Sequence, residues 1–172
     1  SADDVLSETA KGDLLDAFVK SGTYQGKLYG MPDLSSARAF FYNKDLFDKA
    51  GVAYPTADWT WKEELEAAQK LTDTANGVWG DFAPIQFWEF YKKAAQNNCE
   101  FFNADKTEVT INTPECVEAL QTMIDFVQTD KVMPSDVDMG GVADGDLFKS
   151  GKIAMDVTGI WMFSAFQDAS FK

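Results

Sequence analysis

Apolar residues recur at helical spacing in two long stretches of the chain. The first begins at Thr60-Trp61-Lys62-Glu63, which has the form of a capping box, and one apolar face continues from it toward Asp73. The second opens with Thr113 as N-cap and Pro114 at the first helical position, and its apolar stripe runs to Val127. Both patterns predict amphipathic helices that bury one face.

Shorter apolar runs between polar or glycine-containing breaks predict the remaining elements. The best strand candidate is Ala37 to Tyr42, which is rich in aromatic residues and too short for a typical helix. Further strands are expected at 28–31, 78–82, 108–112 and 153–157, further helices at 13–20, 44–50, 86–97, 145–149 and 160–166, and a loop at 133–144. Strands that alternate with helices, without a hairpin signal of the Asn-Gly type, predict an α/β fold, helix-rich and layered around a small mixed sheet.

The composition narrows the classes of function. The 172 residues contain 15 Lys and Arg against 28 Asp and Glu, a formal net charge of −13, so nucleic acid and anionic lipid surfaces are repelled. The absence of His excludes His-ligated metal sites and the Ser-His-Asp and Cys-His catalytic arrangements. Aromatic residues make up 14% of the chain, more than a core of this size needs, and part of them is expected to face a ligand.

The chemistry-bearing motifs are equally restrictive. Gly26-Lys27-Leu28 lacks the Ser or Thr and the glycine loop of a phosphate-binding motif, and a calcium loop beginning at Asp136 has Leu147 where a bidentate Glu is required. We therefore expect no catalytic residue, no metal and no cofactor. Cys99 and Cys116 are the only two cysteines, with 16 residues between them, and both a disulfide and two unpaired thiols remain open.

Several motifs occur in an order that is typical of one protein family. The chain strongly resembles the extracellular solute-binding proteins of carbohydrate importers, the family that includes maltose-binding protein. The resemblance covers nearly everything from Gly26 to Phe166. Its motifs are Gly26-Lys27-Leu28-Tyr29-Gly30-Met31-Pro32, the run from Ala39 to Gly51, Thr60-Trp61, Trp88-Glu89-Phe90, the run from Ile111 to Leu120, the run from Phe148 to Met155, and Gly159-Ile160-Trp161.

The resemblance implies one lobe of a two-lobe fold of the periplasmic-binding-protein type, in which the lobes close on a sugar held between them. Residues 1–172 then form a single domain, with 1–32 as the tail of the first lobe and 33–172 as the second, ligand-binding lobe. The implied function is binding of a mono- or oligosaccharide for delivery to an ABC transporter permease, without enzymatic activity. The implied location is extracellular, as a membrane-anchored lipoprotein, or periplasmic. A carbohydrate-active enzyme, a solute-binding protein for a non-sugar ligand and a purely structural module remain as alternatives.

The resemblance also points to ligand-binding residues. Sugar rings stack their C–H faces on aromatic rings, and we expect Trp161 to be such a platform rather than a core residue. Of Phe87 and Trp88, one is expected to contact the ligand and the other to pack inside. Trp61 is assigned to the core. Four residues at the entry to the second lobe are candidates for binding sugar hydroxyls, with a solvated hinge loop as the alternative: Asp33, Ser35, Ser36 and Arg38.

Two departures from the family pattern affect local geometry. Asn97-Asn98 replaces a frequent Gly-Gly pair, and Gly159-Ile160-Trp161 replaces Gly-Pro-Trp. Both leave the fold assignment intact and loosen the transfer of exact ligand contacts.

Overall fold

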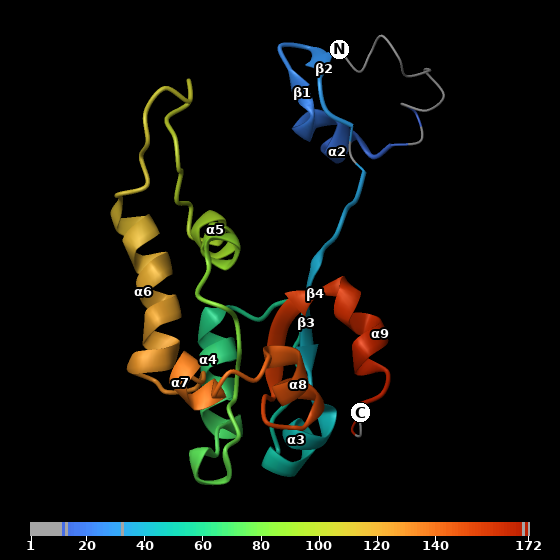
Figure 1. The fold of residues 1–172 in the computed structure, drawn as a ribbon. Helices are drawn as coiled ribbons and strands as arrows, with labels where there is room; N and C mark the ends of the chain where they lie inside the picture. Colours follow the sequence, from blue (N-terminus) through green and yellow to red (C-terminus); the bar gives the residue numbers. More distant parts are fainter. Residues whose placement is uncertain (1–11, 13, 32, 170, 172) are drawn as a thin grey trace. The chain divides into compact units, whose positions relative to one another are not determined.

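The computed structural model describes residues 12, 14–31, 33–169 and 171 (Figure 1). The chain divides into two compact units, Ser1–Ala37 and Arg38–Lys172. The boundary lies near the predicted one between 32 and 33. The assignment of these parts to two lobes stays a prediction.

The first unit contains helix α2, Asp16–Ser21, followed by a small hairpin of β1, Thr23–Tyr24, and β2, Lys27–Leu28. Helix α2 accounts for the later part of the helix expected at 13–20, while Asp13 lies outside the described residues. The hairpin was not predicted. Gln25 and Gly26 both have positive φ, 47° and 76°, which is the geometry of a primed two-residue turn without the usual Asn-Gly sequence.

The second unit is built on a small sheet. Strand β3, Arg38–Tyr42, pairs antiparallel with β4, Met155–Gly159, so that Phe40 lies opposite Val157. The segment 78–82 runs parallel to β4, with bridges from Trp79 to Ile153 and from Phe82 to Asp156. The predicted small mixed sheet is therefore confirmed, although 78–82 bridges at single residues and β4 begins two residues later than expected.

Helices flank this sheet, and most begin where the sequence predicts. Their bounds are α3 Lys44–Ala50, α4 Trp61–Leu71, η2 Thr74–Asn76, α5 Phe87–Gln96, α6 Pro114–Gln128, α7 Asp136–Met139, α8 Asp144–Lys149, η3 Ile160–Met162 and α9 Phe163–Phe166. The capping box of α4 is present: the Thr60 side chain accepts from the helix backbone, and Glu63 accepts from the Thr60 backbone.

Three of the sequence-based assignments are wrong. Of the strand expected at 28–31, only Leu28 belongs to a strand, because β2 ends there. The segment 133–144, expected to be a loop, contains α7, which Ser135 and Asp138 start with a second capping box. The strand expected at 108–112 is reduced to one bridge between Phe102 and Val109. The chain at 108–112 therefore gains little hydrogen bonding from a sheet.

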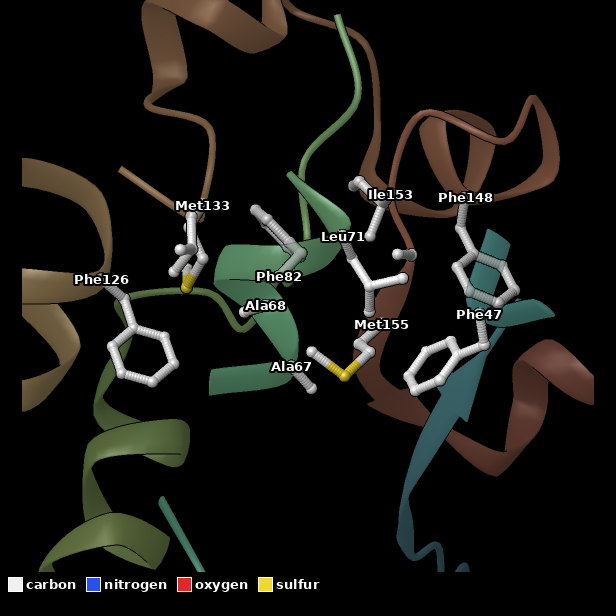
Figure 2. Packing of buried hydrophobic residues seen from close by; sticks show 12 residues of the cluster. Phe47, Ala67, Ala68, Leu71, Phe82, Phe126, Met133, Phe148, Ile153 and Met155 are labelled. Atoms are coloured by element: carbon white, nitrogen blue, oxygen red, sulfur yellow. The ribbon is translucent and has the colours of Figure 1, made fainter. Parts of the chain in front are cut away.

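The main core lies where α4 packs on the sheet. Ala67, Ala68 and Leu71 of α4 are buried there, between residues of α6 and its following loop on one side and residues of β4, α3 and α8 on the other (Figure 2). Phe47 of α3 and Met155 of β4 have no exposed surface. This burial holds the sheet, and hence the end of β4, in a fixed place.

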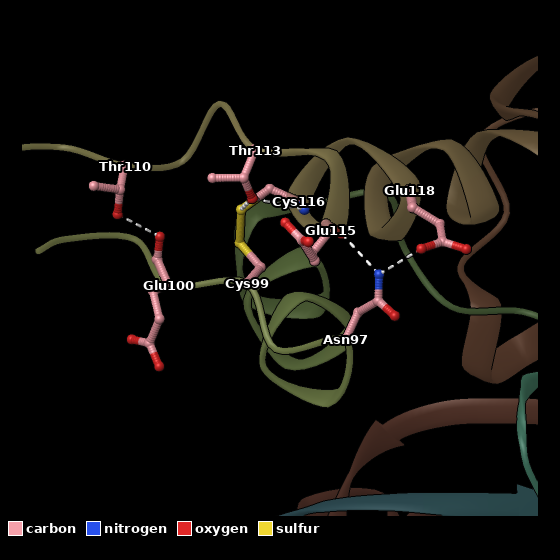
Figure 3. The surroundings of a disulfide bond; sticks show 8 residues. All are labelled: Asn97, Cys99, Glu100, Thr110, Thr113, Glu115, Cys116 and Glu118. Atoms are coloured by element: carbon pink, nitrogen blue, oxygen red, sulfur yellow. Dashed lines mark hydrogen bonds between the residues drawn. A yellow bond between two sulfur atoms is a disulfide. The ribbon is translucent and has the colours of Figure 1, made fainter.

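A second, smaller core joins α5 to α6, which lie side by side (Figure 1). Cys99 and Cys116 form a disulfide there, which settles the alternative that the sequence left open (Figure 3). Beside it, the Asn97 side chain donates to the Glu115 carbonyl at 2.8 Å. Trp61 packs on this cluster, as expected of a core residue.

No helix within the described parts of the chain is both long and apolar enough to cross a bilayer.

Candidate ligand-binding site

A cleft of about 540 Å³ lies in the second unit, where the carboxyl end of β4 meets the first turns of α5 and α8. Three of the predicted site residues line it together: Arg38 from β3, Trp88 from α5 and Trp161 from η3. These residues are far apart in the sequence, so it is the sheet and its connections that bring them to one place.

The Trp161 side chain is held in position although 56% of the residue is exposed. A β-carbon built on Gly159 would come within 2.0 Å of Trp161 Cζ3, so the ring lies directly against the glycine. The Arg38 guanidinium carbon lies 5.6 Å from the centre of the Trp161 ring, within the range of a cation–π contact. Because 56% of Trp161 is exposed, the alternative that it is a core residue is excluded.

Arg38 is itself anchored. Its Nη2 donates to the Glu89 carboxylate and, at 3.1 Å, to the Val157 carbonyl. Glu89 is buried and also pairs with Lys92, so one carboxylate on α5 faces two cations. Arg38 thus ties β3 to α5 and supports Trp161. Its predicted contact with sugar hydroxyls stays a prediction.

Phe87 and Trp88 are both exposed, by 64% and 55%, so the expectation that one of them packs inside is wrong. Trp88 lines the cleft, whereas the Phe87 ring lies 5.9 Å from that of Phe101. Phe101 stacks in turn on Phe90 at 5.7 Å. The turn of α5 therefore directs Trp88 into the cleft and Phe87 toward Phe101.

Asp33, Ser35 and Ser36 are exposed residues of the first unit. All residues that line the cleft belong to the second unit. The cleft therefore does not test whether these three residues bind the ligand. Their role in hydroxyl binding stays a prediction.

The cleft also contains polar residues that the sequence did not single out. They are Gln86, before α5, together with Asp144, Asp146 and Lys149 of α8. Within the described residues, none of these four side chains forms a hydrogen bond or ion pair, so they are free to bind a polar ligand. Only the folding of α8 against the end of β4 reveals them, because short helices with acids in the first turn are common.

A buried carboxylic acid lies on β4 two residues before Thr158, which lines the cleft. Asp156 has no exposed surface, and its side-chain oxygens have no hydrogen-bond partner among the described residues. Burial raises the pKa of Asp156 to about 8, and the charges of Asp144 and Glu89 add to this against the opposing effect of Arg38. This shift favours the protonated form of Asp156 at neutral pH.

A second buried acid lies beside the ion pair of Glu64 and Lys93. Burial raises the pKa of Asp81 well above its ordinary range, and the negative charge of Glu64 raises it further. Asp81 precedes Phe82, so both buried acids belong to the sheet region, one on β4 and one on the segment beside it.

A second cleft, of about 560 Å³, includes Arg38 but neither Trp88 nor Trp161. Its two tryptophans are engaged in packing: Trp59 lies against Phe47, and the Trp61 Nε1 donates to Gln96 at 2.9 Å. The cleft with two exposed indole rings and four free polar side chains is therefore the better candidate for a ligand. In the described part of the chain, no three His, Cys, Asp or Glu side chains form a group able to hold a metal ion.

The family described as bacterial extracellular solute-binding protein matches residues 2–171. An ABC substrate-binding protein from Listeria monocytogenes, solved in complex with cycloalternan, is 54% identical with a TM-score of 0.88, over 94% of this chain and 42% of that one. The cyclic α-maltosyl-1,6-maltose binding protein from Arthrobacter globiformis is 26% identical with a TM-score of 0.76, over 100% of this chain and 44% of that one.

Among curated sequences, a binding protein of Brucella abortus is 30% identical over 159 residues, which is 91% of this chain and 38% of the relative. The chain thus spans about two fifths of the length of the relatives it matches. The two-lobe proteins among the solved structures confirm the predicted fold class and the resemblance on which it rested.

Proposed function

Because the chain belongs to the family of bacterial extracellular solute-binding proteins, we propose that it supplies part of a binding site for a mono- or oligosaccharide. The proposal extends to the whole protein, which delivers the sugar to the permease subunits of an ABC importer. Its lobes close around the sugar, and the permease distinguishes the closed form from the open one by differential affinity.

The observation that carries this proposal is that Trp161 and Trp88 line the same cleft. Two exposed indole rings offer flat apolar surfaces for the C–H faces of sugar rings. The free side chains of Gln86, Asp144 and Lys149 lie in the same cleft and offer partners for hydroxyl groups, which cost about 1–3 kcal/mol each when they are buried unpaired. This combination of stacking and hydrogen bonding is the chemistry that sugar recognition requires.

Three further statements belong to the proposal. The protein binds its ligand without chemical conversion, as the relatives in this family do. It works outside the cytoplasmic membrane, as a periplasmic protein or a lipoprotein held by a lipid anchor. Asp33, Ser35, Ser36 and Phe87 contribute further contacts to the ligand in the complete protein.

A thermal-shift screen of the complete protein tests the proposal. The panel contains cycloalternan, maltotriose and arabinooligosaccharides, with amino acids and glycerol 3-phosphate as non-sugar probes. A sugar present at a hundred times its dissociation constant is expected to stabilise the protein by about 2.7 kcal/mol. Stabilisation by a non-sugar probe and by no sugar contradicts the proposed ligand class. Release of a cleaved product contradicts the assignment as a binding protein.

A further inference from the structure

Helix α5 carries an exposed aromatic face that continues beyond the cleft. Resting on the proposed function, we infer that this face is a second sugar subsite, in which Phe87 and Tyr91 hold those rings of a sugar chain that extend past Trp88. The cleft holds the first rings of the chain. The aromatic face then makes the protein bind longer chains more tightly than shorter chains of the same sugar.

Three aromatic side chains lie on the same side of α5. An α-helix turns by about 100° per residue, so Phe87, Tyr91 and Trp88 fall within one arc of about 100°, with Tyr91 between the other two. They are exposed by 64%, 56% and 55% in that order. The opposite side of the helix contains its buried residues, Glu89 and Ala94. The exposed side of α5 is therefore one continuous aromatic surface.

This surface begins at the cleft. Trp88 lines the cleft together with Trp161, whereas Phe87 and Tyr91 lie outside the cleft lining. Residues three apart on a helix are surface neighbours, so Tyr91 adjoins Trp88 one turn further along α5. A sugar chain that stacks on Trp88 and continues along the helix therefore meets Tyr91 next.

Phe101 fixes the outer two rings in place. Its ring lies 5.9 Å from the ring of Phe87 and 5.9 Å from that of Tyr91. Phe101 packs in turn on the small core between α5 and α6, two residues after the disulfide-bonded Cys99. Aromatic rings that are already held before binding lose little conformational entropy when a ligand covers them.

Packing on Phe101 does not account for the aromatic area of this face. More than half of Phe87 and of Tyr91 stays exposed in spite of that contact. The Tyr91 hydroxyl forms no hydrogen bond with any residue that the structure describes. A flat ring with a free hydroxyl offers a sugar both a stacking face and a hydrogen-bond partner. Single exposed aromatic residues are common, but neighbouring ones that adjoin a cleft are typical of a contact surface.

Calorimetric titration of the complete protein with sugars of increasing length tests the subsite. The probes are maltose to maltoheptaose and arabinobiose to arabinohexaose, with cycloalternan as a compact sugar. Within a series that binds, we expect the longest chain to bind the wild type about tenfold more tightly than the shortest, the order that a stacked aromatic contact supplies. Tyr91→Ala should remove most of this gain and change the affinity for the shortest bound chain by less than about twofold.

Two further variants separate stacking from other effects. Tyr91→Phe keeps the ring and should keep most of the gain with chain length. Phe102→Ala is the matched control, because Phe102 is 50% exposed and lies outside α5. An affinity that does not rise with chain length, or a rise that Tyr91→Ala leaves intact, overturns the inference while sugar binding stands. Binding of cycloalternan without binding of any linear chain has the same meaning.

A second copy of the chain is the other occupant that such a surface fits. Sedimentation analysis of the wild type without sugar distinguishes it, and a dimer that Tyr91→Ala dissociates overturns the inference. If neither cycloalternan nor a linear sugar binds, the proposed function fails, and the inference fails with it.

Discussion

The indole ring of Trp161 rests on Gly159: a β-carbon at position 159 would lie 2.0 Å from Cζ3 and 2.1 Å from Cη2 of that ring. Such distances are far below van der Waals contact, so any side chain at 159 forces the indole to move. The glycine therefore fixes where the exposed face of Trp161 stands in the cleft.

Gly159→Ala is accordingly expected to weaken sugar binding by about tenfold through displacement of Trp161, since lost stacking of an aromatic ring is worth about 1 kcal/mol or more. The measurement is a calorimetric titration with the best sugar of the screening panel. Gly30→Ala is the control, because a β-carbon there meets nothing closer than 3.9 Å. Equal affinities for Gly159→Ala and the wild type would show that the position of Trp161 is not important for binding.

The ion pair of Arg38 and Glu89 beneath Trp161 is expected to stabilise the fold. The Glu89 side chain is 3% exposed and faces Arg38 and Lys92, so Glu89→Gln leaves two cations without their shared countercharge. We expect the free energy of unfolding to fall by about 2 kcal/mol in urea denaturation. Glu66→Gln, which removes an exposed partner of Lys62, should change it by less than about 0.5 kcal/mol. Similar effects of the two substitutions would mean that Glu89 is not a structural anchor.

The raised pKa of Asp156 is expected to make the stability of the protein depend on pH. Its pKa is about 8 in the fold, whereas an aspartate in the unfolded chain titrates near pH 4. The unfolded chain therefore releases this proton at lower pH than the native one, so the contribution of Asp156 to stability is largest at low pH and is lost as pH rises from about 4 to about 8. The raised pKa of Asp81 acts in the same direction.

Asp156→Asn removes this titration while it preserves the shape of the side chain. Chemical denaturation at about pH 5 and about pH 8.5 should show a smaller loss of stability in the variant than in the wild type. Asp105→Asn, at an exposed loop position, is the control and should leave the profile unchanged. A wild type that becomes more stable between these pH values contradicts the account of Asp156.

The disulfide between Cys99 and Cys116 ties the segment that follows α5 to the first turn of α6, across a sequence separation of 17 residues. The loop-entropy account gives about 3 kcal/mol for a closed loop of this size. We expect Cys99→Ala/Cys116→Ala to lose that amount in denaturant unfolding, and a reductant to lower the stability of the wild type but not of the double variant. If the free energy of unfolding of the wild type is the same with and without reductant, after full unfolding and refolding, the disulfide does not contribute to stability.

The sequence predicted those elements whose signals are local. The Thr60 and Glu63 capping box and the Thr113-Pro114 start were identified because each lies within four residues. The second capping box, at Ser135 and Asp138, was missed because Asp replaces the usual Glu or Gln and the segment that follows contains Gly140 and Gly141.

Some residues of the candidate site were identified from the sequence, and others are recognised only in the fold. Trp161, Trp88 and Arg38 came from resemblance to a family, and the fold places all three in one cleft. Asp144 and Asp156 went unnoticed, because an acid in a first helical turn or within a strand is normally solvated. Their proximity arises only when α8 packs against β4, a long-range contact that no local pattern encodes.

Calorimetric titration of cycloalternan into the complete protein and its Trp161→Ala variant tests the central claim most directly. The account predicts saturable binding to the wild type, at least about tenfold weaker binding to Trp161→Ala, and little change for Phe102→Ala, an exposed aromatic residue outside the cleft. Undiminished binding by Trp161→Ala, with both proteins folded, would contradict the claim that this cleft holds the sugar.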